Sequence, residues 1–205
     1  MAYNMLSTAA GRVCTGFSKP YVAQYSNSGT TVSYSTPVEL ARGVSVTIDP
    51  ESSDANVFYA NNIQAESESG EFSGGTLNLT VDGLLIDKTA LLMGLTAPTT
   101  DGDWIAFGTQ SAAPYFGVGF ITRYRSGGVT SFVPTLIAKV KFDQIGNDAE
   151  SQEEDIDWQT QELTAQIYRA DDANQTWKYE GSEYSTEAAA VTALLTKFGV
   201  TPPSP

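Results

Sequence analysis

The sequence contains no histidine, and this absence removes several kinds of chemistry at once. Without histidine there is no Ser-His-Asp or Cys-His nucleophile and no imidazole to ligate a metal ion. The single cysteine, Cys14, can form neither an internal disulfide nor a cysteine-ligated zinc site. No glycine-rich phosphate loop follows a strand pattern, since Gly127 and Gly128 belong to a hairpin turn. We therefore expect no enzyme activity, no cofactor and no bound metal.

Cations and long apolar runs are also scarce. The chain has 11 Lys and Arg residues against 24 Asp and Glu residues, which gives a net charge of −13. Because affinity for phosphate comes from clustered Lys and Arg, we expect no specific binding of nucleic acid. No stretch approaches the ~20 apolar residues of a membrane span, and the N-terminus lacks the pattern of a signal peptide. These features predict a soluble protein, folded in a reducing cytoplasm, with no membrane partner.

Carboxylates are abundant, but their distribution does not favour catalysis. Paired acids can hydrolyse glycosides, whereas the acids of this chain concentrate in a loop and on polar strand faces. The pairs Asp101 with Asp103 and Asp171 with Asp172 lack the repeated ligands and closing Glu of a calcium loop. Solvated surface is the better interpretation of both patterns.

Alternating apolar and polar residues predict strands along most of the chain. Residues 44–48 alternate clearly before Pro50, which we expect to end that strand, and residues 55–60 are its expected partner. Hairpins are predicted for residues 16–35 and 115–142, with turns rich in Ser, Asn and Gly. In residues 136–142 every second residue is apolar (Leu136, Ala138, Val140 and Phe142), and we expect these four side chains to share one face of a strand. Residues 66–75 predict a mobile loop, and Pro134 predicts an edge position or a bulge.

Two helices are predicted. A short one covers residues 88–93, with Asp87 as its N-cap and Gly94 at its end. The other follows Ser185 as N-cap and ends at Gly199, and its apolar residues recur at three- and four-residue spacing to face the sheet: Ala188, Val191, Leu194, Leu195 and Phe198. Because helices do not alternate with strands, we expect a mainly β chain: one antiparallel sandwich or barrel domain over residues 1–205, with a short helix and a C-terminal helix.

The segments outside this domain body carry separate expectations. Residues 1–15 predict a flexible or interface-forming arm, and residues 200–205 a C-terminal tail. Residues 147–156 predict an acidic loop, because six of the ten residues from 148 to 157 are carboxylates: Asp148, Glu150, Glu153, Glu154, Asp155 and Asp157. Like charges at this density favour an extended, solvated loop.

The acidic loop has two interpretations. It can serve solubility alone, or it can dock on a basic surface of a neighbouring subunit. Four basic residues occupy the alternate, polar positions of the predicted hairpin at 115–142, and we expect them to form one positive stripe: Arg123, Arg125, Lys139 and Lys141. The second interpretation makes these ten charged residues candidates for contacts between subunits.

Six segments, in order and at matching spacing, resemble the major tail protein (tail tube protein) family of long-tailed, siphovirus-type phages of Gram-positive bacteria. They are KPYVAQYS (19–26), GVSVTIDPESSDANVFYANN (43–62), SGGTLNL (73–79), YFGVGFITRYRSGGVTSFVPTLIAKVKF (115–142), DIDWQTQELTAQIYR (155–169) and STEAAAVTALLTKFG (185–199). The loop at 97–113 departs from the family pattern, and we assign it no role.

The resemblance implies a structural virion protein of the tail tube fold, made in the host cytoplasm. Its subunits would form hexameric rings that stack into a tube through which DNA is ejected without specific binding. The implied partners are other copies of the chain, the tape measure protein, the tail terminator and the distal tail or baseplate proteins. In that setting the positive stripe could instead face the lumen and touch passing DNA. The alternative function is a surface or secreted β-sandwich module that binds carbohydrate.

Overall fold

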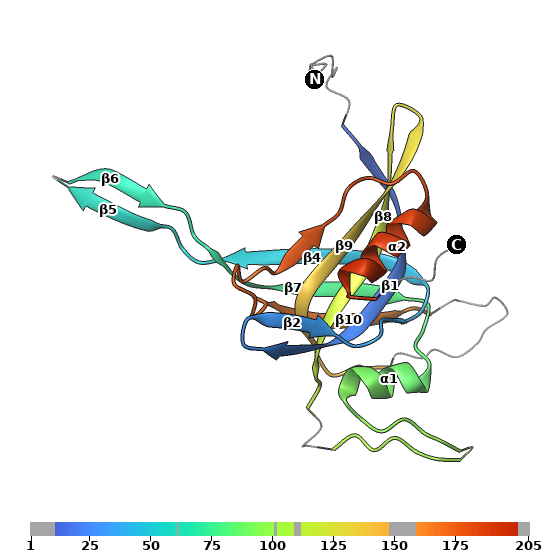
Figure 1. Cartoon of the computed structure of the whole chain (residues 1–205). Helices are drawn as coiled ribbons and strands as arrows, with labels where there is room; N and C mark the ends of the chain where they lie inside the picture. Colours follow the sequence, from blue (N-terminus) through green and yellow to red (C-terminus); the bar gives the residue numbers. More distant parts are fainter. Residues whose placement is uncertain (1–10, 61, 101, 109–111, 148–158, 201–205) are drawn as a thin grey trace.

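Nine strands form one antiparallel sheet that curls around the main hydrophobic core (Figure 1). The structure is a computed structural model and describes residues 11–60, 62–100, 102–108, 112–147 and 159–200. The strand order is β2-β1-β8-β9-β10-β7-β4, with β3 paired to β1 and β11 paired to β9, while β5 and β6 form a separate two-stranded sheet. The mainly β, antiparallel fold with a short helix and a C-terminal helix is therefore confirmed.

The elements in chain order are β1 (Val13–Ser28), β2 (Thr31–Tyr34), β3 (Val38–Glu39), β4 (Gly43–Ser52), β5 (Asn56–Ala60), β6 (Ile63–Glu68), β7 (Phe72–Val81), α1 (Ile86–Met93), β8 (Tyr115–Ser126), β9 (Val129–Phe142), β10 (Gln161–Tyr168), β11 (Lys178–Glu180) and α2 (Glu187–Lys197).

The main core lies on the inner face of the curled sheet. Strand β7 contributes Leu77, Leu79 and Val81, all fully buried, because alternate side chains of a strand point to the same face. Helix α1 covers one end of the sheet with Leu92 and Met93. The helix ends at Gly94 as predicted, with φ of +66°. Its N-cap is Leu85 rather than Asp87, which lies in the first turn, where its charge still favours the helix dipole.

Helix α2 packs on the outer face of β8 and β9. Its buried residues Ala190 and Leu194, together with Phe198 at its C-cap, pack in one cluster with Ile121 of β8 and Leu136 of β9. The helix approaches closely because β8 has glycine beneath it: a Cβ at Gly119 would lie 2.7 Å from Leu194. Contact of this stripe with the chain's own sheet is as predicted.

The start of α2 differs by one residue from the prediction. Thr186, not Ser185, is the N-cap, and its hydroxyl accepts a hydrogen bond from the Ala189 amide at 3.3 Å. Ala188 is exposed and lies outside the buried stripe. Gly199 follows the helix with a φ of +90°, as expected of a helix stop.

The predicted shared face of Leu136, Ala138, Val140 and Phe142 is wrong, and Ala138 lies in a separate cluster with Tyr25 and Ala170. Phe116 pairs with Val140 and Val118 with Ile137, so two steps on β8 oppose three on β9. This irregularity moves Leu136 to the cluster under α2, while Val140 and Phe142 line the main core. A one-residue slip exchanges the two faces of a strand, and periodicity alone does not reveal where it occurs.

Strand pairing in the first half of the chain also differs from the prediction. Strand β4 pairs with β7, whereas residues 56–60 pair with β6. Residues 66–75, predicted as a mobile loop, lie largely in β6 and β7. A Cβ at Gly75 would lie 2.6 Å from the Asp49 carbonyl, so its glycine permits a close backbone approach. Strand β4 continues through Pro50 because it lies at the sheet edge, where a missing N–H is tolerated.

Pro134 lies in a central strand rather than at an edge. It pairs with Ile121 of β8 on one side, and on the other its carbonyl accepts a hydrogen bond from the Gly181 amide at 2.8 Å. Gly181 directly follows β11, so the missing N–H of Pro134 falls where that short pairing ends. The expected edge or bulge at this residue is therefore wrong.

Replacing Leu194 with Ala should lower the free energy of unfolding of the monomer by ~2 to 5 kcal/mol, because Leu194 is only 2% exposed and the site cannot collapse against the rigid sheet. Urea denaturation measures this change. Leu195→Ala is the matched control, since Leu195 is only partly buried and the loss should be clearly smaller. Unchanged stability of Leu194→Ala with lost self-association would instead make α2 an interface helix.

Candidate assembly surfaces

The four basic residues predicted to form one stripe separate into two groups on the β8–β9 hairpin. Lys141 pairs with Tyr115 at the open end, whereas Arg125 pairs with Thr130 beside the turn. Ten residues separate Tyr115 from Arg125 along β8, and at ~3.4 Å per residue this is roughly 34 Å. The expected single stripe is therefore wrong, because antiparallel pairing places residues that are far from the turn at the opposite end from those beside it.

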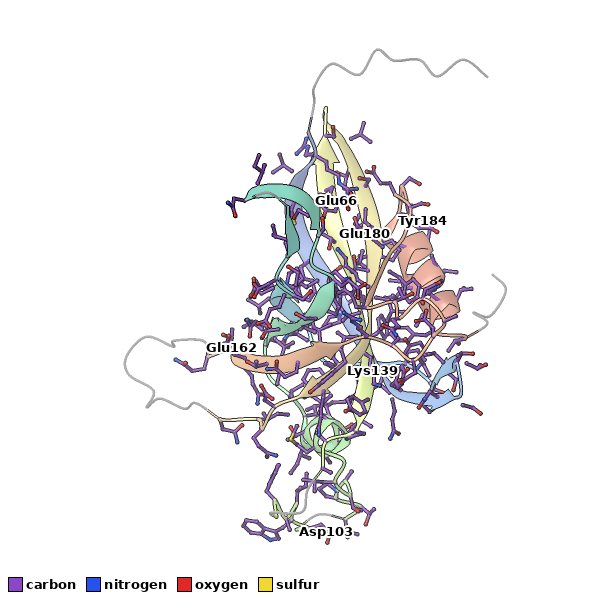
Figure 2. The ribbon with its side chains drawn as sticks, turned by 90° about the vertical axis from the view of Figure 1, so that its left-hand side faces the viewer. Glu66, Asp103, Lys139, Glu162, Glu180 and Tyr184 are labelled. Atoms are coloured by element: carbon purple, nitrogen blue, oxygen red, sulfur yellow. The ribbon has the colours of Figure 1, made fainter. Side chains whose placement is uncertain are left out.

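Lys139 is engaged within its own chain. Its Nζ lies 2.7 Å from Asp171 Oδ2, and its side chain is 14% exposed. The ammonium also lies 5.0 Å from the ring centroid of Tyr25 and 4.7 Å from that of Tyr115. Figure 2 shows Lys139 near the middle of the molecule. These contacts make Lys139 a poor candidate for docking a separate subunit.

The same cluster perturbs two titratable groups. Hydrogen bonds from Lys139 and Tyr25 lower the pKa of Asp171, because they stabilise the carboxylate. Burial is the main cause that raises the pKa of Tyr25 to about 12, since it disfavours the phenolate. The Tyr25 hydroxyl donates to Asp171 at 2.8 Å and accepts from the Asp171 amide at 2.9 Å, which ties β1 to the segment after β10.

Asp171→Asn should reduce the pH dependence of stability in acid. A carboxyl whose pKa is lowered by folding stabilises the native state above its ordinary pKa near 3.8, and this contribution disappears as the pH falls through the lower folded value. The free energy of unfolding, measured by urea at pH 7 and at pH 3, should therefore fall less in the variant than in the unmodified protein. Asp54→Asn, at an exposed position, is the control and should leave the slope unchanged. Equal slopes for all three proteins would contradict this assignment.

Arg123 and Arg125 remain available for a partner. Both are exposed on β8, and within the described residues neither guanidinium contacts a carboxylate or an aromatic ring. Most other cations are paired, for example Arg12 with Glu180 and Glu183 at 3.0 and 2.8 Å. Lys141 lies 5.9 Å from the ring centroid of Tyr115. The two arginines are thus the strongest remaining basic candidates.

The six carboxylates of the acidic run lie outside the described residues, so their docking on a basic surface stays a prediction. The arginines supply its test. Glu153→Lys combined with Glu154→Lys should block self-association and leave the subunit folded, because like charges would then face each other. Adding Arg123→Glu and Arg125→Glu should restore association, as scored by sedimentation. Normal association of the first variant would refute the docking.

Strands β5 and β6 form an arm that projects from the body (Figure 1, left). Among the described residues their backbone pairing is only with each other, from Asn56 with Glu68 to Ala60 with Ile63. A two-stranded hairpin is marginally stable in water by itself, and Ile63 is 69% exposed. The sequence pattern did not indicate this arm, because it predicted residues 55–60 as the partner of the strand at 44–48.

Strand edges are a second feature suited to contacts between chains. Strands β2 and β4 end the main path of the sheet, and β4 pairs along one side only, with β7. Free N–H and C=O groups on such an edge can pair with another strand. The edge of β4 also carries Val44, which is 52% exposed.

The described part of the chain holds no cluster of three His, Cys, Asp or Glu side chains able to bind a metal ion. None of its helices has the length and apolar character needed to cross a bilayer. The chain matches no model of a known protein family. It also has no significant match among curated proteins.

Proposed function

We propose that the protein is a structural subunit of a phage tail, the major tail protein that assembles into stacked hexameric rings around a DNA channel. The observation that carries the proposal is the projecting β5–β6 arm, which in the described part of the chain pairs only with itself and would gain stability from a second surface. The open edge of β4 and the six family-like segments support it further.

The net charge of the chain suits the proposed channel. A ring of six subunits would carry 6 × −13 = −78 formal charges. Duplex DNA bears one negative charge per ~1.7 Å of its axis, so a negative wall would repel it and permit passage without binding. The self-repulsion of the subunits would in turn require contacts that are largely apolar or made between backbones.

The proposed subunit would bury an obligate-type interface of more than ~2,000 Å² with its neighbours. Its further partners would be the tape measure protein, the tail terminator and the distal tail or baseplate proteins, with the virion tail as its location.

Negative-stain microscopy of the purified protein tests the proposal, and rings or tubes are the expected result. Replacing residues 56–68 with a short Gly-Ser linker should abolish these assemblies and leave a folded monomer, because the arm makes no backbone pairing with the body. Circular dichroism and urea denaturation check the fold. Tubes that persist without the arm would show that the arm is not needed for assembly. A full-length chain that stays strictly monomeric would overturn the proposal.

A carbohydrate-binding module is the second candidate, and one observation favours it. Trp104 is 93% exposed on a loop, where its ring could stack on a sugar. Calorimetric titration with oligosaccharides separates the two functions: saturable binding by a monomer that loses it on Trp104→Ala would favour the module.

A further inference from the structure

The β5–β6 arm joins the body through two short connections, residues 53–55 after β4 and residues 69–71 before β7 (Figure 1). The β4–β7 ladder ends at the pair of Ser52 with Phe72, and the arm begins at the pair of Asn56 with Glu68. Most residues of the two connections are exposed. Connections of this kind would let the arm swing unless other contacts hold its base.

The two connections lie in close contact with each other. The Ser53 amide donates to the Glu71 carbonyl at 2.8 Å, and the Glu71 amide donates to the Ser53 hydroxyl at 3.0 Å. A Cβ at Gly70 would collide with the Ser53 carbonyl oxygen, so this approach requires glycine. The base of the arm is therefore packed backbone against backbone, which restricts rotation of one connection about the other.

Arg169 holds the same base from the body. Strand β10 pairs with β7 as far as Gly75, and Arg169 directly follows the end of β10. Its Nε donates to the Phe72 carbonyl at 2.6 Å, and its Nη2 donates to the same oxygen. Its Nη1 donates to Gln175 Oε1 at 3.0 Å and lies 3.4 Å from Glu71 Oε2. The planar guanidinium, with donors pointing in several directions, is suited to such a set of acceptors.

The ring of Phe72 is held as well. It stacks on Trp177, with ring centroids 4.5 Å apart and ring planes 5° from parallel, and both rings pack against the main core. The Trp177 carbonyl accepts a hydrogen bond from the Ala138 amide of β9 at 2.9 Å. The first residue of β7 is thus tied to the body through both its carbonyl and its side chain.

Arg169 also brings a positive charge to a negative part of the chain. The sequence has no Lys or Arg between Arg42 and Lys88, so the arm and its base carry only acidic charges: Glu51, Asp54, Glu66, Glu68 and Glu71. Because Glu71 is 81% exposed, its ion pair with Arg169 contributes little to stability. The charge-assisted hydrogen bonds to the Phe72 carbonyl are the stronger part of the contact.

We propose that Arg169 is a positioning residue that fixes the angle between the arm and the body, so that each subunit presents its arm to the next in one preset direction. The proposal rests on the proposed function, in which the arm contacts a neighbouring subunit. An arm that is already oriented loses little conformational entropy on binding, which strengthens association without a new contact. A closed ring also needs the same rotation at every repeat, since other rotations give open filaments.

The distance between two spin labels measures this angle in dilute, unassembled protein. In a Cys14→Ser background, Ile63→Cys places one label at the exposed tip of the arm, and Thr192→Cys places the other on the exposed side of α2. The distance distribution should be narrow with Arg169 present. It should become clearly broader after Arg169→Ala, because the Phe72 carbonyl then loses its donors.

Two controls separate the angle of the arm from general stability. Arg42→Ala removes an arginine that is paired with Asp82 beside the opposite end of β4, and it should leave the arm distance narrow. Labels at Thr47 and Thr192 report the body alone, and their distance should stay narrow in Arg169→Ala. An arm distance that is broad in the unmodified protein, or that Arg169→Ala leaves unchanged, would overturn the proposal. Equal broadening of the body distance would overturn it too.

Self-association measures the consequence for assembly. An arm that keeps the competent direction for about a tenth of the time binds about tenfold more weakly, because binding draws only on that fraction. Sedimentation should therefore show a loss of about this size in Arg169→Ala. Unchanged association of a variant whose arm distance has broadened would overturn the role of the fixed angle.

Failure of the fixed angle is distinguishable from failure of the proposed function. Tubes formed by a protein whose arm distance is broad would overturn the fixed angle and leave the tail proposal intact. A narrow distance that depends on Arg169, in a protein that forms no rings or tubes, would support the fixed angle and overturn the tail proposal.

Discussion

Strands β8 and β9 are packed on both faces, and the rest of the structure depends on this double burial. On β8 the side chains of Phe116, Val118 and Phe120 enter the main core, while Gly117, Gly119 and Ile121 lie under α2. The helix rests almost directly on the backbone, so any side chain larger than hydrogen at Gly119 would meet Leu194 and Phe198. The close packing of α2 on β8 therefore restricts the size of the residue at position 119 as well as its polarity.

This central hairpin decides which parts of the chain remain at the surface. With β1 on one side and β10 on the other, β2 and β4 become the ends of the path, and the sheet curls until β1 approaches β4. Phe17 of β1 packs against Gly43 of β4 without a ladder of hydrogen bonds between the two strands. A cavity of about 440 Å³, lined by Phe17, Val46 and Phe120 among others, opens beside these two strands. The edge of β4 is thus a consequence of how the central strands are buried.

Electrostatic pairing follows the same arrangement. In a chain of net charge −13, most cations find an acidic partner in their own subunit, as Lys139 does with Asp171 and Lys19 with Glu39. An exposed pair such as Lys19 with Glu39 contributes only ~0 to 1 kcal/mol. The larger effect of these pairs is to leave few cations without an acidic partner; among the described residues these are Arg123, Arg125, Lys141 and Lys197, and the last two lie over tyrosine rings.

Sequence periodicity was sufficient for the local elements. Interactions within a few residues explain three of these elements. They are the alternation in β7, the apolar stripe of α2, and the turn of Gly127 and Gly128, whose φ angles are +56° and +86°. The mainly β class follows from these elements, because strands with one apolar face and two isolated helices have few ways to bury their surfaces.

Only the tertiary structure decided the pairing of distant strands and the positions of the charges. Three findings depend on the register between distant segments. Strand β4 pairs with β7 instead of β5, a register shift places Leu136 and Val140 on opposite faces, and Arg125 lies far from Lys141. Register is set by the packing of whole faces, and a single strand pattern is compatible with several partners. The cavity beside β4 could not be predicted from the sequence for the same reason.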